Sequence, residues 1–238
     1  MRGCLFTLVA AAIVLAVVVT VGLPAVAAGL LTAGIAAAGL QADDTTVTVR
    51  SDPPTDLIGM HADHVRVIAT DATFRGLEIG RLDLTLDDVA VLSRTAGSVD
   101  GTLEDVTVPL ATGDIHLDRI TVAGTADHIT ATTVIPKAQA EALVKDAVEQ
   151  QTGVRPDAVT LSGPDRVTIQ AAGGLELQGR LGVTADGDLV LRGEGPLAGH
   201  DAVLVHGGED LTINIKDVRV TQAGGLRLSG DLAIGLLG

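Results

Sequence analysis

Apolar and polar residues alternate along most of this chain after residue 43, and this period of two constrains the fold more than any other feature. Successive side chains of a strand point to opposite sides, so alternation predicts strands that bury one face. Short connections containing Gly and Asp separate many of the alternating segments, which predicts antiparallel pairing of consecutive strands. The segments include Val47/Val49, Val65/Val67, Ile120/Val122, Val167/Ile169 and Leu226/Leu228.

The alternation changes phase at Gly80-Arg81. Leu77 and Ile79 share one parity, and three leucines of the next segment take the other: Leu82, Leu84 and Leu86. A shift of one residue turns the apolar face over unless a bulge or a bend absorbs it. We therefore expect a bend in the sheet at this point.

A helical period occurs in one segment, at about residues 136–152. Pro136 suits the first helical position, and Gly153 suits the position after the end. Five apolar residues form one stripe at helical spacing: Ala140, Leu143, Val144, Ala147 and Val148. The predicted fold class is therefore α+β and β-dominated, with a curved, mostly antiparallel sheet and one main amphipathic helix.

No charged residue occurs between Gly3 and Ala42, and the run from Leu5 to Leu23 is long enough to span a membrane as one helix. We interpret residues 1–42 as a signal anchor with a cytoplasmic N-terminus, because Arg2 precedes the run. The alternative is a signal peptide cleaved near residues 25–27, which would release a secreted or periplasmic protein. Both interpretations place residues 43–238, the β-rich domain, outside the cytoplasmic membrane.

The composition excludes several classes of function. A net charge of −14 has the wrong sign for binding nucleic acid. Aromatic residues make up 1% of the chain, so the core must be aliphatic and stacking on bases is nearly excluded. The single cysteine, Cys4, excludes an intrachain disulfide and a cysteine-rich zinc site.

No catalytic or cofactor-binding constellation is present. His61 and His64 flank Asp63, but three-residue spacing in a strand would place the two imidazoles on opposite faces. We therefore expect no metal site there. Ser98 does not stand in the G-x-S-x-G turn that exposes a hydrolase nucleophile. We expect no catalytic residue, no cofactor and no metal.

The segment from Pro53 to Val91 resembles the LmeA-like phospholipid-binding family of bacterial envelope proteins. The motifs that carry the resemblance are Pro-Pro-x-x-Leu-Ile-Gly from Pro53, Ala-Asp-His-Val-Arg-Val from Ala62, Gly-Leu-x-Ile from Gly76, Leu-x-Leu-x-Leu from Leu82, and the helix entry Val134–Ala138. The resemblance extends over about residues 45–169. It implies an exported domain that binds lipid on the apolar side of a curved sheet, similar to the tubular lipid-binding folds.

On this resemblance we expect a membrane-anchored, non-catalytic phospholipid-binding protein of the cell envelope, whose partners are the membrane and a phospholipid. The expected lipid contacts are the helix stripe and the leucines after the phase change: Leu143, Val144, Ala147, Val148, Leu82, Leu84 and Leu86. Three arginines close in sequence are candidates for the phosphate of the head group: Arg66, Arg75 and Arg81.

Two alternatives stay open. The first is a β-domain of the envelope with a structural or interaction role and no ligand. The second is a lipid hydrolase, because phospholipase activity has been associated with a member of the family. No catalytic motif of the family maps onto these residues, and Ser98 is the serine that a hydrolase hypothesis would test.

Overall fold

The computed structural model describes residues 40–74, 76–90, 95–109, 113–125, 128–171, 173–195, 198–199, 201–206 and 213–232, together with residues 28, 29 and 32. The expected spanning segment and its cleavage site lie outside the described residues, as does Arg75. Within the described part of the chain, no helix is both long enough and apolar enough to cross a membrane.

The first of two antiparallel sheets holds eight strands in the order β1-β2-β3-β4-β5-β6-β13-β12. The first six are consecutive in sequence, as expected from the short connections. Their bounds are β1 Leu40–Arg50, β2 His61–Phe74, β3 Leu77–Ala90, β4 Ser98–Val108, β5 Ile115–Thr125, β6 His128–Ile135, β12 Ile213–Val220 and β13 Leu226–Leu232.

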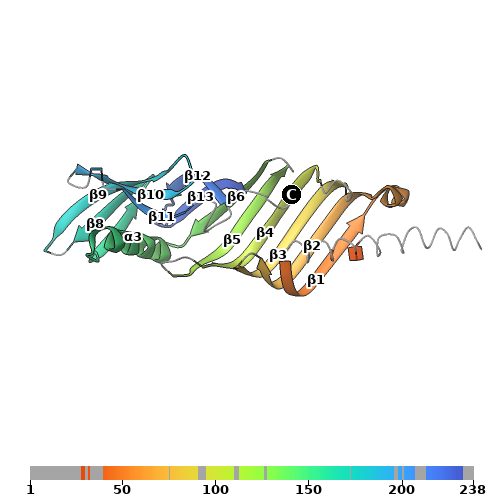
Figure 1. The fold of residues 1–238 in the computed structure, drawn as a ribbon, viewed down its shortest axis with the longest axis horizontal. Helices are drawn as coiled ribbons and strands as arrows, with labels where there is room; N and C mark the ends of the chain where they lie inside the picture. The colour runs from red at the N-terminus through yellow and green to blue at the C-terminus, as the bar shows by residue number, and fades with distance from the viewer. Residues whose placement is uncertain are drawn as a thin grey trace, which may run out of the picture.

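The second sheet holds five strands in the order β11-β10-β9-β8-β7. Their bounds are β7 Ala158–Ser162, β8 Arg166–Ala171, β9 Leu175–Val183, β10 Leu189–Glu194 and β11 Asp201–Val205. Figure 1 shows this sheet and the helix at one end of an elongated molecule, with β1–β5 at the other end. The expected single sheet is therefore two sheets, while the antiparallel, β-dominated class with one main helix is confirmed.

The helix α3 spans Lys137–Thr152, close to the expected bounds. Pro136 precedes the helix rather than opening it, and its carbonyl accepts the first helical hydrogen bond, from Ala140 N at 2.9 Å. Gly153 ends the helix with φ 73°, and its N–H donates to Glu149 O at 2.7 Å. A left-handed residue satisfies the last carbonyls of a helix, which explains the glycine here.

The phase change expected at Gly80-Arg81 is present, because Ile79 is 3% exposed and Leu82 is 5% exposed. It is one of five phase changes that lie opposite one another on neighbouring strands, and together they form a row across β1–β5. Asp71 and Asp105, opposite Gly80 on either side, have left-handed backbones with φ 47° and 53°. Aspartate tolerates this conformation better than most residues. The row continues to β1 and β5, and its five members are Asp43, Asp71, Gly80, Asp105 and Asp118.

A second row of the same kind lies near the start of β2. Ala62 and Val65 are both buried although they have opposite parity, so Asp63 and His64 between them both face outward. Asp88, opposite Asp63 on β3, has φ 51°. The two rows let β2 and β3 each keep one apolar face toward the interior although their sequences alternate in three phases.

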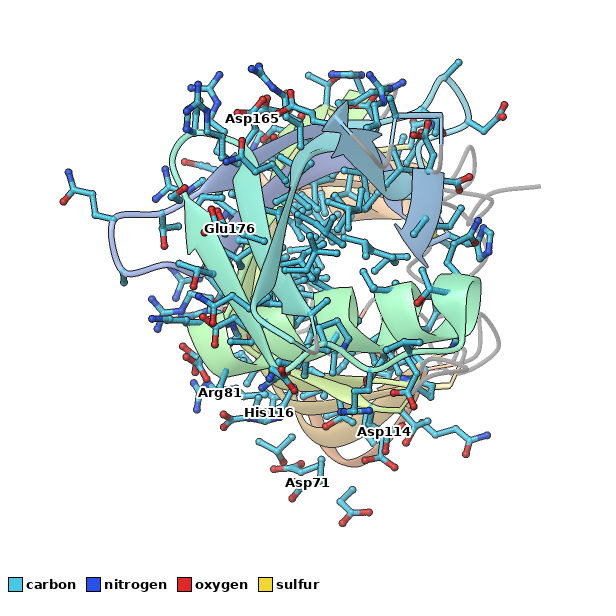
Figure 2. The ribbon with its side chains drawn as sticks, turned by 90° about the vertical axis from the view of Figure 1, so that its left-hand side faces the viewer. Asp71, Arg81, Asp114, His116, Asp165 and Glu176 are labelled. Carbon is cyan, nitrogen blue, oxygen red and sulfur yellow. The ribbon has the colours of Figure 1, made fainter. Side chains whose placement is uncertain are left out.

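The interior is one contiguous aliphatic cluster that includes residues of both sheets and of α3. Viewed along the molecule in Figure 2, the strands and α3 surround a central mass of side chains. Asp71, Arg81, Asp114 and His116 lie outside this mass. The short connection between β1 and β2 contains the 3₁₀ helix η2, Pro54–Gly59, in which Leu57 is buried and Ile58 is 66% exposed.

Candidate functional site

The inner face of the first sheet is fully buried at β5 and β6, whereas at β1–β4 buried inward residues are mixed with partly buried ones. On β5 and β6 the inward residues Leu117, Ile120 and Ile135 are at most 5% exposed. The inward residues of the first four strands that are only partly buried are Leu40, Ala42, Val47, Phe74, Leu77, Leu84, Leu86 and Leu103. Among the described residues, partly buried apolar side chains of the interior are therefore most numerous at β1–β4.

Leu84 lies at the centre of this partly covered region. It pairs in register with Val67 on β2 and Gly101 on β4. A side chain at position 101 would collide with the Leu84 side chain, which therefore extends over the space that glycine leaves. Of the three leucines expected to contact lipid, Leu82 is buried, while Leu84 and Leu86 are partly buried.

The apolar stripe of α3 occupies a different place. Leu143, Val144, Ala147 and Val148 are all buried, as the helical period predicts. The helix packs on β7 and β11 of the second sheet, at the end of the molecule away from β3 (Figure 1). The two groups of expected lipid contacts share one interior but lie at its two ends.

A small apolar recess lies between α3 and the second sheet. Its walls include Val148, Ile169, Leu191 and Ala202, and its volume is about 30 Å³. Pockets for small-molecule ligands typically measure roughly 300–1,000 Å³. This recess does not hold a phospholipid in the present conformation.

Two of the expected head-group arginines are on the outer side of the sheet. Arg66 lies between the buried residues Val65 and Val67, so its side chain points away from the interior. It donates from Nε to Asp83 Oδ1 at 2.9 Å and from Nη2 to Asp83 Oδ2 at 2.7 Å. This two-fold hydrogen bond lowers the pKa of the Asp83 carboxyl and raises the pKa of Arg66. Arg81 is exposed on the same outer side (Figure 2).

His64, Asp87 and Ser98 form a chain of hydrogen bonds across β2, β3 and β4. Asp87 contacts His64 Nδ1 through Oδ1 at 2.8 Å, and it accepts from Ser98 Oγ through Oδ2 at 3.0 Å. The carboxylate is in the middle, whereas a Ser-His-Asp triad needs the imidazole between serine and carboxylate. The hydrogen bonds from His64 and Ser98 also lower the pKa of Asp87, which weakens it as a base. This arrangement does not activate Ser98.

His61, Asp63 and Asp88 come together on the same outer surface, with one ligand atom of each within 4.8 Å of the others. The expectation that His61 and His64 face opposite ways was wrong, because the strand changes phase between Ala62 and Val65. Sequence spacing alone could not reveal this cluster. The one signal in the sequence is the pair of adjacent polar residues, Asp63-His64 and Asp87-Asp88, that interrupts the alternation on each strand.

A family model described as LmeA-like phospholipid-binding matches residues 18–234, which is most of the chain. A search of curated proteins and a search of solved structures each gave no match.

Proposed function

The chain belongs to the LmeA-like phospholipid-binding family, and on this premise we propose that it is a membrane-tethered, extracytoplasmic protein that holds phospholipid acyl chains against the inner face of β1–β4. The observation that carries the location is the concentration of partly buried inward side chains there. Each methylene group removed from water contributes about 0.8 kcal/mol, so a few partly covered leucines and valines are enough to favour an acyl chain.

Leu84 and Leu86 are the proposed centre of the contact, with Val47 and Leu103 beside them. The apolar stripe of α3 lies at the other end of the same interior. Its residues are already buried against the second sheet, so they are not available to an acyl chain in this proposal. The acyl chain would pack between the inward apolar side chains of β1–β4 and displace them only slightly. Apolar side chains suit such a contact, because they present no polar atom to the acyl chain.

The proposed tether is the charge-free run between Gly3 and Ala42, and the proposed β-rich domain is residues 43–238. A segment of this length and composition is long enough to span a bilayer. The role is binding rather than catalysis, a proposal that rests on the order Ser98–Asp87–His64 described above.

The direct test is the lipid content of the purified protein. The full chain is expressed with its leader, purified in a detergent that is not a phospholipid, and extracted for lipid mass spectrometry. We expect a stoichiometric phospholipid in the wild-type protein. Lipid at background level, together with no uptake of added phospholipid, would contradict the proposal.

A second candidate is a structural domain of the envelope without a ligand. The observations that favour it are the close packing at β5 and β6 and the small volume, about 30 Å³, of the recess between α3 and the second sheet. In that case Leu84→Asn would change stability alone. Phospholipid uptake by the wild-type protein separates the two candidates.

A further inference from the structure

We propose that His61, Asp63 and Asp88 form a binding site for one divalent transition-metal ion, and that the preferred ion is zinc. Each residue offers one ligand atom, and these atoms lie within 4.8 Å of one another. His61 and Asp63 come from the start of β2, and Asp88 comes from the end of β3, so a bound ion would join two strands. The inference goes beyond phospholipid binding and does not depend on it.

The charge around the cluster supports a bound cation. Asp63 and Asp88 lie opposite each other on neighbouring strands, between the pairs Ala62–Val89 and His64–Asp87. Like charges in directly opposite positions of an antiparallel pair destabilise the sheet. Within the described residues, no Lys or Arg nitrogen lies within 4 Å of either carboxylate.

Three neighbouring carboxylates on the same side of the sheet have cationic or imidazole partners. Asp83 pairs with Arg66 at 2.7 Å, and Glu104 pairs with Arg119 at 2.7 Å. Asp87 contacts His64 at 2.8 Å. The pair Asp63–Asp88 has no such partner among the described residues, and a cation held with His61 would balance its charge.

The surroundings of Asp63 fit the role of a metal ligand. Its Oδ2 accepts a hydrogen bond from Asp52 N at 2.6 Å and one from Ser51 Oγ at 3.4 Å. These bonds fix the carboxylate and leave Oδ1 for another partner. Metal-ligating carboxylates are commonly held by such hydrogen bonds from a second layer of residues.

The donor set indicates the class of metal. Zinc accepts imidazole nitrogen and carboxylate oxygen at about 2.0–2.2 Å. Calcium and magnesium prefer oxygen ligands alone, so the imidazole of His61 favours a transition metal over them. Three protein ligands leave at least one coordination position open to water.

The test uses the full chain in detergent, freed of metal with a chelator and then titrated with Zn²⁺ by calorimetry. We expect one ion per chain and an affinity at least ten-fold weaker in Asp88→Asn and in His61→Gln. Asparagine tolerates the left-handed backbone at position 88, so this variant keeps the fold. No binding by the wild-type protein, or unchanged binding by both variants, would overturn the proposal.

Matched controls come from another imidazole–carboxylate contact on the same surface. His116 Nε2 lies 3.9 Å from Asp105 Oδ1, and neither residue belongs to the cluster. His116→Gln and Asp105→Asn should therefore leave zinc affinity unchanged. A loss of affinity in these controls equal to that in Asp88→Asn would show non-specific surface binding and overturn the site. A calcium affinity equal to the zinc affinity would overturn the assignment of the metal.

The unfolding temperature, measured with and without Zn²⁺, distinguishes a metal-binding role of Asp88 from a purely structural one. Without metal, Asp88→Asn should unfold at the same temperature as the wild type or higher, because the opposed charges are gone. With excess Zn²⁺ the order should invert, since only the wild type gains stability from the ion. A wild type that is more stable than Asp88→Asn by the same margin with and without Zn²⁺ would contradict the proposal.

Discussion

Gly80 of β3 lies opposite Asp105 of β4, and a Cβ added to Gly80 would stand 2.9 Å from the Cβ of Asp105. The register pairs on either side, Ile79–Val106 and Arg81–Glu104, are both formed. The close approach accompanies the left-handed backbone of Asp105, φ 53°. Gly80 is therefore the position at which the row of phase changes leaves no room for a side chain.

Gly80→Ala should lower the free energy of unfolding by about 1–3 kcal/mol, the usual cost of forcing extra atoms into a packed site. The atom that the new methyl group meets is the root of a side chain, so it cannot move aside without the backbone. Urea unfolding followed by circular dichroism measures the change. Gly59→Ala is the control, because a Cβ there has no neighbour within 4 Å. Equal stability of Gly80→Ala and the wild type would show that the row is not tightly packed.

Of the five strands that this row crosses, the alternation in the sequence predicted the phase change only in β3, at Gly80-Arg81. Gly80-Arg81 interrupts a long run of alternating leucines and is easily seen, whereas Asp43-Asp44 and Asp118-Arg119 interrupt short runs and look like ordinary turns. The left-handed conformations of Asp71 and Asp105 depend on cross-strand neighbours that a single sequence does not display. Strand class and the bounds of α3 were predictable because they depend on local periodicity alone.

The candidate site was less predictable than the fold. Leu84 and Leu143 both follow from the apolar period, but their positions at opposite ends of one interior depend on how the two sheets are arranged. The clusters of His64 with Ser98 and of His61 with Asp88 join residues far apart in sequence, on different strands. Register between strands, which is set by the whole sheet, decides such contacts.

Removal of the Asp83 carboxylate should reduce stability at neutral pH and leave it unchanged in acid. Arg66 holds the pKa of Asp83 below its usual value, so the stability that this pair contributes is complete above the unfolded value of 3.8. That contribution is lost as the pH falls through the lower pKa of the folded state. The urea midpoints of the wild type and Asp83→Asn should differ at pH 7 and converge below pH ~3.8.

The contribution of this pair is small, because the Arg66 side chain is 49% exposed and solvent screens the charges. Salt provides the control for the electrostatic origin of the difference, which should shrink at about 1 M ionic strength. A difference between the two proteins that stays constant from neutral pH to pH 3 would assign it to packing rather than to the ion pair.

Ser98→Ala should leave phospholipid binding unchanged and should not lower any lipid turnover measured with the intact protein. Ser98 Oγ donates to Asp87 rather than to an imidazole, so no strong base activates it. Turnover is measured by mass spectrometry of lipid before and after incubation, with the heat-denatured protein as the blank. Turnover by the wild type that disappears in Ser98→Ala would restore the hydrolase hypothesis.

Leu143→Ala should lower the free energy of unfolding by about 2–5 kcal/mol, because the side chain is 6% exposed and its removal leaves a cavity against the second sheet. Gln150→Ala, on the exposed side of α3, should change it by less than about 0.5 kcal/mol. Under conditions where Leu143→Ala is folded, its phospholipid affinity should match the wild type. Lost affinity without lost stability would instead move the lipid contact to α3.

Phospholipid is proposed to lie against the inner face of β3. Equilibrium titration of the delipidated full chain, in detergent, with a fluorescent phospholipid tests this claim. The variants to compare are Leu84→Asn and Thr85→Asn, which change neighbouring residues on opposite faces of one strand.

Wild type and Thr85→Asn should bind saturably with equal affinity. Leu84→Asn should bind roughly ten-fold or more weakly, because burying an amide without a partner costs about 1–3 kcal/mol. Both variants must show cooperative unfolding for the comparison to count. Equal affinities of Leu84→Asn and Thr85→Asn, or no saturable binding by the wild type, would contradict the claim.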